Sequence, residues 1–237
     1  MEVNYFVYNG ESSLDHGMYI GGQRTFNAPQ RDVTKVAIPG KNGDLIKDNG
    51  RWLNINVPYN IVIMDEFKYR ADEVRAWLCE PKGYARLEDT YHPESFRLAR
   101  FGSSIDFATS AWNKVGRASI VFDCMPQRFL KSGENFEAVS NGLSIFNPTR
   151  YPSKPIVRVT CSGSGSVIVN GYEIELTDIS TYVDIDSELQ DCYVGQQSYN
   201  NKVALGNGFP LLKSGRNVVF WSSGVSAVEI MGRWYTV

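Results

Sequence analysis

The sequence has few of the residues that build catalytic and metal centres. Its 237 residues include only two histidines, His16 and His92, and four cysteines without any C-x-x-C pair. Zinc sites need closely spaced Cys and His ligands, so zinc-finger spacing is absent. We expect the cysteines to be buried and reduced, since free cysteine packs as a small apolar side chain. They are Cys79, Cys124, Cys161 and Cys192.

Runs of like charge and long apolar segments are also missing. The 24 basic and 26 acidic residues give a formal net charge of -2 and are spread along the chain. No basic stripe is available to neutralise phosphates, so nucleic-acid readout is not expected. No apolar stretch reaches the length of a membrane span, and the start "MEVNYFVYNG" lacks the pattern of a secretory signal. We therefore expect a protein made and folded in a cytoplasm, with no membrane partner.

Aromatic residues, glycine and proline are abundant. The chain has 13 Tyr, 12 Phe and 5 Trp together with 21 Gly and 10 Pro, which favours short strands joined by turns. The length fits one large β domain or two domains of about 100 to 150 residues, and a domain of that size needs no disulfide or metal to be stable.

The first half is predicted to begin as a sheet that carries one helix. In "EFKYRADEVRAWLCEPKG" four apolar residues share one stripe at helical spacing, and a proline and a glycine follow as stop signals. This predicts an amphipathic helix over residues 66–79. The strands expected before it are separated by glycine-rich turns that include "PGKNGD". They are Asn4–Tyr8, Met18–Ile20, Asp32–Ile38 and Trp52–Met64.

Alternating strands continue to about Pro126, where the first unit closes. From Gln127 to Pro155 the chain turns polar, with "KSGEN", "SNG", "NPT" and "YPSKP", which is typical of a linker or loop. Beyond it Asn170-Gly171 suits the positive φ of a type I′ hairpin turn. Further strands are expected at Tyr182–Ile185, Asn217–Ser222 and Val225–Tyr235. The prediction is a mainly β protein with a sandwich-like N-terminal domain carrying one helix over residues 1–130 and a C-terminal β-sandwich over 131–237.

Three carboxylates in "YVDIDSELQDCYVG" resemble the start of a calcium loop. Asp184, Asp186 and Glu188 share one face if the strand continues. An EF-hand loop needs Gly at its sixth position and Glu at its twelfth, but those positions are Leu189 and Gly195. We interpret the acids as turn and strand-end residues that accept backbone N–H groups and stay solvated.

No motif points to catalysis. "GSGS" over residues 163–166 lacks a following Lys-Ser/Thr and precedes a strand, so we interpret it as a turn. His16 and His92 sit in separate predicted turns, and sequence alone leaves a Ser/His/Asp triad open because its members meet only in space. No catalytic, cofactor-binding or metal residue is predicted, and no cofactor.

The aromatic residues of the second domain fit two interpretations. Aromatic rings stack on sugars in many carbohydrate-binding sandwiches, and they equally suit core packing and protein contacts. The residues are Tyr172, Tyr182, Tyr193, Phe220, Trp221, Trp234 and Tyr235.

Taken in order, several segments resemble the distal tail protein family of long-tailed phages that infect Gram-positive bacteria. The first unit contributes "YFVYNGESSLDHGMYI", "VAIPGKNGDL", "VRAWL" and "VFDCMPQRF". The second contributes "YPSKPIVRVTCSGSGSVIVNG", "YVDIDSELQDCYV", "FPLLKSGRNVVFW" and "GRWYTV". Each piece is ordinary turn and strand chemistry; their order and spacing carry the resemblance, which runs nearly end to end.

The resemblance implies a structural virion protein at the phage tail tip, synthesised in the bacterial host cytoplasm, and not an enzyme. Its N-terminal domain would form a six-membered ring and its C-terminal domain a galectin-like sandwich. The implied partners are copies of itself, the tail tube protein, the tail-associated lysin or hub protein, and receptor-binding or baseplate proteins, while DNA passes through the lumen without specific binding. The sugar-contacting histidine of galectins has no counterpart, because no His follows His92.

Two functions of other classes remain open. One is a carbohydrate-binding module in the second domain that contacts host cell-wall polysaccharide, which requires exposed coplanar aromatic rings. The other is a hydrolase, which requires a cleft with His16 or His92 beside a nucleophile.

Overall fold

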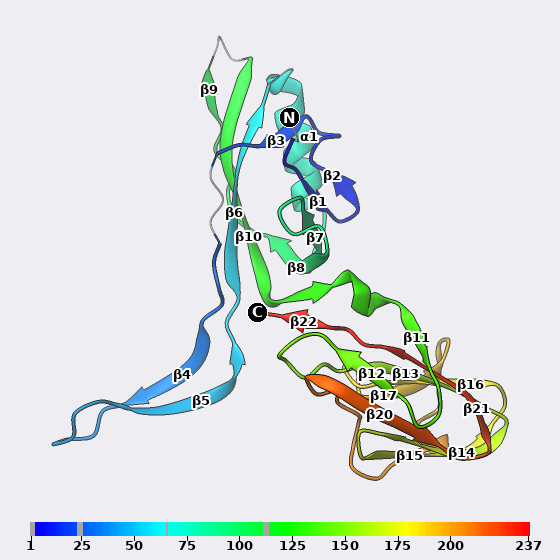
Figure 1. Ribbon diagram of the computed structural model, residues 1–237. Helices are drawn as coiled ribbons and strands as arrows, with labels where there is room; N and C mark the ends of the chain where they lie inside the picture. The colour runs from blue at the N-terminus through cyan, green and yellow to red at the C-terminus, as the bar shows by residue number, and fades with distance from the viewer. Residues whose placement is uncertain (1–2, 23–25, 65, 111–113) are drawn as a thin grey trace. The chain divides into compact units, whose positions relative to one another are not determined.

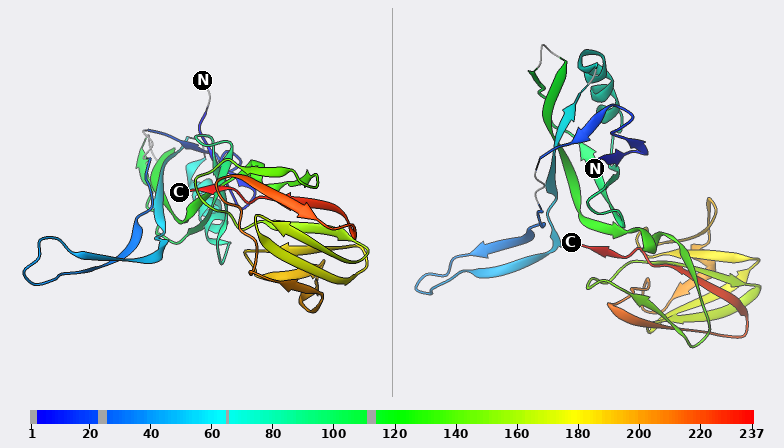
Figure 2. Two further views of the ribbon diagram at one scale, coloured as in Figure 1. Left: turned by 60° about the horizontal axis from the view of Figure 1, so that its bottom comes forward. Right: turned by 45° about the horizontal axis from the view of Figure 1, so that its top comes forward.

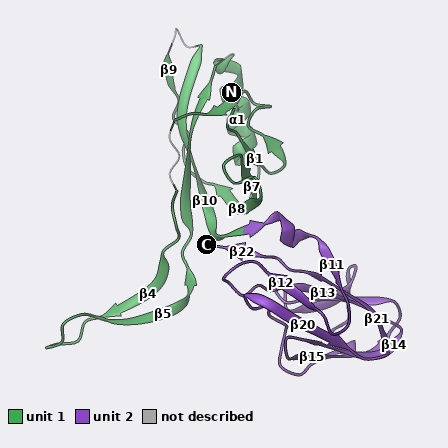
Figure 3. Ribbon diagram, in the orientation of Figure 1, with its two compact units in different colours: residues 1–128, 237 green, residues 129–236 purple. Residues whose placement is uncertain are grey.

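The chain forms two compact units, residues 1–128 with Val237 and residues 129–236 (Figure 3). The computed structural model describes residues 3–22, 26–64, 66–110 and 114–237. Each unit has its own cluster of buried apolar residues. Unit 1 and unit 2 therefore each have a core of their own.

In its described residues, unit 1 has ten strands and one helix (Figure 1). The elements are β1 (Phe6–Tyr8), β2 (Glu11–Ser12), β3 (Met18–Ile20), β4 (Arg31–Val36), β5 (Leu45–Trp52), β6 (Ile55–Ile63), α1 (Phe67–Cys79), β7 (Ala85–Asp89), β8 (Ser95–Phe101), β9 (Ala108–Ser110) and β10 (Val115–Leu130).

The main sheet of unit 1 has the strand order β2-β1-β7-β8-β10-β6-β3, with β9 also paired to β10. The long pair β6 and β10 is antiparallel and aligns Ile55 with Cys124 and Ile63 with Gly116. Along β6 every second side chain is buried, as expected for a strand with one face on a core. The core contains a cluster of aromatic rings, with Phe6 stacked on Trp77 and set edge-on to Phe122.

The predicted helix over residues 66–79 is confirmed as α1 at Phe67–Cys79. It buries Ala71, Val74, Trp77 and Leu78, three of which belong to the core cluster that includes the sheet residues. Glu66, at the N-cap, has φ 53° and makes no side-chain cap. The helix therefore depends on packing of its apolar stripe more than on capping.

Strands β4 and β5 form a separate two-stranded sheet, called the arm below and defined as residues 31–52. The predicted strand Asp32–Ile38 corresponds to β4, whereas β5 was not predicted, because "LIKDNGRW" is mostly polar and has no buried face. Both views of Figure 2 show the arm as a ribbon without another element of its unit packed on it.

Unit 2 is a β-sandwich made of two sheets. Its elements are η1 (Lys131–Glu134), β11 (Phe136–Val139), β12 (Ser144–Asn147), β13 (Ile156–Cys161), β14 (Gly163–Val169), β15 (Tyr172–Ile179), β16 (Tyr182–Asp186), β17 (Asp191–Val194), β18 (Gln197–Ser198), η2 (Asn200–Lys202), β19 (Val203–Leu205), β20 (Gly215–Trp221), β21 (Val225–Met231) and β22 (Tyr235–Thr236). One sheet has the order β11-β21-β13-β16-β17-β18, the other β12-β20-β14-β15-β19.

The predicted Asn-Gly hairpin is confirmed. Val169 pairs with Tyr172, and Asn170 and Gly171 between them have φ 54° and 89°. Both values are positive, as a type I′ turn requires. The mainly β fold with one α-helix is likewise as predicted.

Three local predictions for unit 2 were wrong. The supposed linker 127–155 contributes β11 and β12, which are edge strands with few buried side chains, so their polar composition looks like that of a loop. The "GSGS" segment is not a turn but the start of β14, where a register shift between Gly163 and Gly165 accommodates the glycines. The last predicted strand is interrupted after Met231, because Arg233 adopts φ 49°.

The cysteines are free, and three of the four are buried as predicted. Cys79 is the last residue of α1 and is exposed, although Leu78 before it is buried, so the prediction was wrong for this residue. Burial raises the pKa of the Cys124 and Cys192 thiols to about 12, which keeps them protonated and unreactive at neutral pH. Within the described part of the chain, α1 is too short and too polar to cross a bilayer.

Candidate functional surfaces

The acidic motif of β16 forms ion pairs inside unit 2. Asp184 accepts two hydrogen bonds from Arg158, at 2.7 and 2.8 Å, and Asp186 accepts two from Arg233 at the same distances. Asp186 is fully buried and Asp184 is 5 % exposed. The expectation that these two acids stay solvated was wrong, because their arginine partners lie 26 and 47 residues away and could not be read from the local sequence.

Asp186 also accepts backbone N–H groups, as predicted. The N–H groups of Glu188 and Leu189 donate to Asp186 Oδ1 at 2.9 and 3.0 Å. Burial alone would raise the pKa of Asp186, but the hydrogen bonds from Arg233 and from these two N–H groups outweigh burial and hold the pKa below its usual value. The carboxylate is thus ionised and its oxygens are used by protein donors. This arrangement stabilises a strand end and leaves little capacity for a calcium ion.

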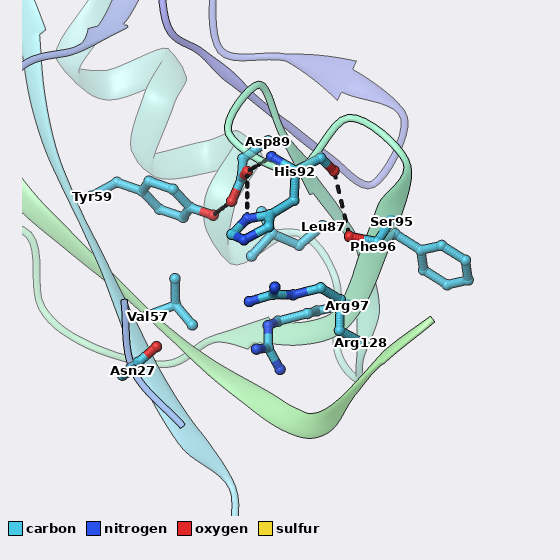
Figure 4. Close-up of a pocket in the computed structure, with 10 residues that line it drawn as sticks. All are labelled: Asn27, Val57, Tyr59, Leu87, Asp89, His92, Ser95, Phe96, Arg97 and Arg128. Carbon is cyan, nitrogen blue, oxygen red and sulfur yellow. Dashed lines mark hydrogen bonds and ion pairs between the residues drawn. The ribbon is translucent and has the colours of Figure 1, made fainter. Parts of the chain in front are cut away.

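His92 lines a small cavity in unit 1 (Figure 4). Its Nδ1 lies 3.5 Å from Asp89 Oδ1, and Tyr59 donates to Asp89 Oδ2 at 2.7 Å. The Ser95 hydroxyl donates to the main-chain carbonyl of His92, not to its ring. The cavity measures about 20 Å³, which is room for one water molecule. The geometry needed for a nucleophile activated by a base is therefore not formed by Ser95 and His92.

His16 does not line the cavity beside His92. Its ring stacks on Trp77 with centroids 4.2 Å apart, and its Nε2 lies 3.1 Å from Glu11 Oε2. The His16 ring thus covers Trp77, which belongs to the core of unit 1. The described residues contain no group of three or more His, Cys, Asp or Glu side chains placed to hold a metal ion.

The aromatic residues of unit 2 divide between core and surface. Trp234 is 2 % exposed and belongs to the core cluster, whereas Phe220 is 51 % exposed. Phe220 lies on the outer side of the sheet that contains β12, β14 and β20, next to three other exposed apolar residues. We call this set the apolar face. Its members are Phe146, Ile168, Val218 and Phe220.

Most of the apolar face was not predicted from the sequence. The signal was present in "RNVVFW", where consecutive apolar residues on a strand must point to both sides of the sheet. Val219 faces the core and is fully buried, so its neighbours Val218 and Phe220 must face outward. "SIFN" repeats the pattern with Ile145 buried and Phe146 63 % exposed.

The arm carries a second exposed apolar surface. Residues 34–51 are all exposed, including Val36, Ile38, Leu45 and Ile46. The base of the arm is tied by cross-strand ion pairs, Arg31 with Asp48 at 2.8 Å and Arg51 with Asp32 at 2.6 Å. An isolated two-stranded ribbon is marginally stable in water, so such a ribbon favours contact with another surface.

Comparisons with known proteins identify the fold. No protein-family model and no curated protein matches the chain. Among solved structures, the Dit (gp 19.1) protein of phage SPP1 matches with a TM-score of 0.82 at 12 % identity, covering 100 % of both chains. That protein is described as a paradigm of the hub adsorption apparatus in phages that infect Gram-positive bacteria. A chain from the phage P2 baseplate in its activated conformation with calcium matches with a TM-score of 0.51 at 10 % identity, covering 97 % of both chains. The chain therefore has the fold of a phage distal tail protein over its full length, and the resemblance stated from the sequence is confirmed at the level of the fold.

Proposed function

We propose that the chain is a structural virion protein that forms a hexameric ring at the distal end of a phage tail. The ring would join the tail tube to the tail-tip hub and the host-adsorption apparatus. The observation that carries the proposal is the correspondence with SPP1 Dit along both whole chains, at a TM-score of 0.82. A fold shared over the full length of both chains is more informative than a shared single domain.

Self-association is supported by the surfaces of the chain. A closed ring needs two different patches on each subunit that complement each other. The arm and the apolar face are exposed surfaces available for contacts between copies, and they lie on different units. Acidic and basic residues are mixed along the sequence without basic runs, which suits protein contacts and gives no sequence signal for binding DNA phosphates. DNA would accordingly pass the lumen without specific binding.

The proposed partners are copies of the chain, the tail tube protein, the tail-associated lysin or hub protein, and receptor-binding or baseplate proteins. The proposed location is the tail tip of the virion, after synthesis in the host cytoplasm. We propose no enzymatic activity. Ser95 donates to the main chain of His92, the His92 ring faces Asp89, and the cavity beside them has room for only one water molecule.

The direct test is the oligomeric state of the purified full chain. We expect native mass spectrometry to give six copies per particle and electron microscopy to show six-fold rings. Gold labelling of a tagged chain in assembled phage should mark the tail tip. A chain that stays monomeric at high concentration and with the tube protein present would contradict the proposal.

We further propose that residues 1–130 form the ring and that residues 131–237 fold as a separate sandwich. Each unit has its own buried core, which is typical of domains that fold independently. Residues 1–130 expressed alone should give rings at high protein concentration, while residues 131–237 stay monomeric. Rings from the second fragment alone would contradict this division.

A carbohydrate-binding module remains the second candidate function. The exposed rings of Phe146 and Phe220 favour it, because aromatic faces stack on sugars. Phe has no hydroxyl or N–H to orient a sugar, which weakens the case. Binding of the full chain to purified cell-wall polysaccharide, lost in Phe220→Ala, would support this function over a purely structural role.

A further inference from the structure

The two outer faces of the unit 2 sandwich differ in chemistry. On the six-stranded sheet the outer face is closed by polar contacts, since Arg158 pairs with Asp184 and lies over the rings of Phe136 and Tyr182. The outer side of the five-stranded sheet carries the apolar face, in which Phe146 is 63 % and Phe220 51 % exposed. Contiguous exposed apolar side chains on a sheet mark an interaction surface.

The apolar face is bordered by acids on one side. Glu173 pairs with Ile168 across β14 and β15, and Glu175 pairs with Ser166 in the same ladder. Directly paired residues share a face of the sheet, so both exposed glutamates point outward beside the apolar side chains. Arg216 lies on the other side of the apolar face, on β20, where it pairs with Phe146 of the edge strand β12. The rim along β15 is therefore negative.

The distal half of the arm has the complementary character. Val36 pairs with Leu45, so these two side chains share one face of the ribbon, together with Thr34 and Lys47. The turn beyond them carries Lys41, also exposed. Between residues 33 and 47 the arm has three lysines and one aspartate, which makes its tip positive around an apolar centre.

We propose that the arm of one copy docks on the apolar face of a second copy, with Val36 and Leu45 against Phe220 and Val218, and the lysines over Glu173 and Glu175. Each chain then gives one surface and receives the other, which is the head-to-tail contact that closes a ring. This inference rests on the proposed function, because it names the contact that joins neighbouring subunits. The contact between the arm and the apolar face then adds to the ring contact proposed for residues 1–130, and only the full chain can form it.

Charge reversal on each side tests the contact. We expect K41E/K47E on the arm, or E173K/E175K on the sandwich, to raise roughly tenfold the protein concentration at which half of the full chain is in rings. The chain that carries all four changes should recover the original concentration. Mass photometry measures the half-point, and circular dichroism with thermal melting checks that each variant is folded.

Cysteine cross-linking tests the position. In a Cys79→Ser background, a Leu45→Cys chain mixed with a Phe220→Cys chain should form a disulfide-linked pair under mild oxidation. The matched control replaces Phe220→Cys with Ala227→Cys, which is exposed on the opposite sheet of the same sandwich and should not cross-link.

The possible outcomes separate the two proposals. If the full chain forms hexamers but neither the charge reversals nor the cross-link behaves as expected, the docking is wrong and the proposed function stands. A chain that carries both Leu45→Cys and Phe220→Cys and cross-links only within itself also overturns the docking between copies. Saccharide binding by the apolar face with unchanged ring assembly would overturn it as well. If the full chain forms no oligomer at all, both proposals fail.

Discussion

The two units bury their side chains in different ways. Unit 1 packs an aromatic cluster between one helix and one face of a sheet, with Phe6, Trp77 and Phe122 in ring contact. Unit 2 packs mostly valine, isoleucine and leucine between two sheets, and Trp234 joins them at 2 % exposure. A sandwich closes on itself with inward residues from every strand, whereas a helix-covered sheet in unit 1 leaves the arm outside its core. The unit with the less self-contained fold is therefore the one expected to need neighbours.

Removing the arm should have the largest effect. Because Arg31 pairs with Trp52, residues 33–50 can be replaced by a two-residue Asn-Gly turn without stretching the base. We expect this variant to stay folded, since the arm contributes nothing to the buried core. Because the contact between the arm and the apolar face is lost, ring formation should require a much higher protein concentration than in the full chain. Analytical ultracentrifugation of the variant beside the full chain measures the loss. Unchanged hexamers would show that the arm is dispensable and that unit 1 closes the ring by other surfaces.

Breaking the buried ion pair should destabilise unit 2 alone. Asp186→Ala leaves Arg233 without its carboxylate, and loss of one partner of a buried pair costs about 3 kcal/mol. Urea unfolding followed by Trp fluorescence measures the change. Asp191→Ala, half-buried on the neighbouring strand, is the matched control and should cost less.

The same pair should show a defined pH dependence. The folded pKa of Asp186 lies below its unfolded value, so its stabilisation is present above about pH 4 and is lost as pH falls through the folded pKa. The stability difference between the full chain and Asp186→Ala should therefore shrink in acid. A difference that stays constant between pH 7 and pH 3 would mean that the Asp186 charge contributes nothing.

Adding a methyl group at a glycine of unit 1 should lower stability where the glycine is tightly packed and leave it unchanged where the glycine is open. Gly116 on β10 faces the Phe67 ring closely, so the Cβ of Gly116→Ala would collide with it and cost about 1–3 kcal/mol. Gly83→Ala is the control, because its Cβ would meet open space with no positive φ to oppose it. Equal melting temperatures for the two variants would show that the Phe67 ring moves away freely.

Calcium should have the smallest effect. A ligand at a hundred times its Kd adds roughly 2.7 kcal/mol of stability, which shifts a melting curve visibly. We expect no saturable heat and no shift for the full chain, since Asp184 and Asp186 already bind Arg158 and Arg233. A rise of several degrees on adding calcium would show that the folded chain binds calcium and would contradict this prediction.

Local features were predictable because they depend on short-range backbone chemistry. The Asn170-Gly171 turn follows from two residues that accept positive φ, and α1 follows from apolar residues at helical spacing. The family resemblance was equally readable, since it rests on the order and spacing of such segments along the chain. These features need no knowledge of what lies across the fold.

The tertiary structure alone decided which polar and apolar groups find partners. Asp186 meets Arg233 across 47 residues, and edge strands β11 and β12 form from a segment that looks like a linker. Whether Phe220 faces solvent or core depends on the register of β20, which one residue of slip would invert. Local sequence determines the conformations that a segment can adopt, and long-range pairing determines which surfaces are buried and which remain open for a neighbour.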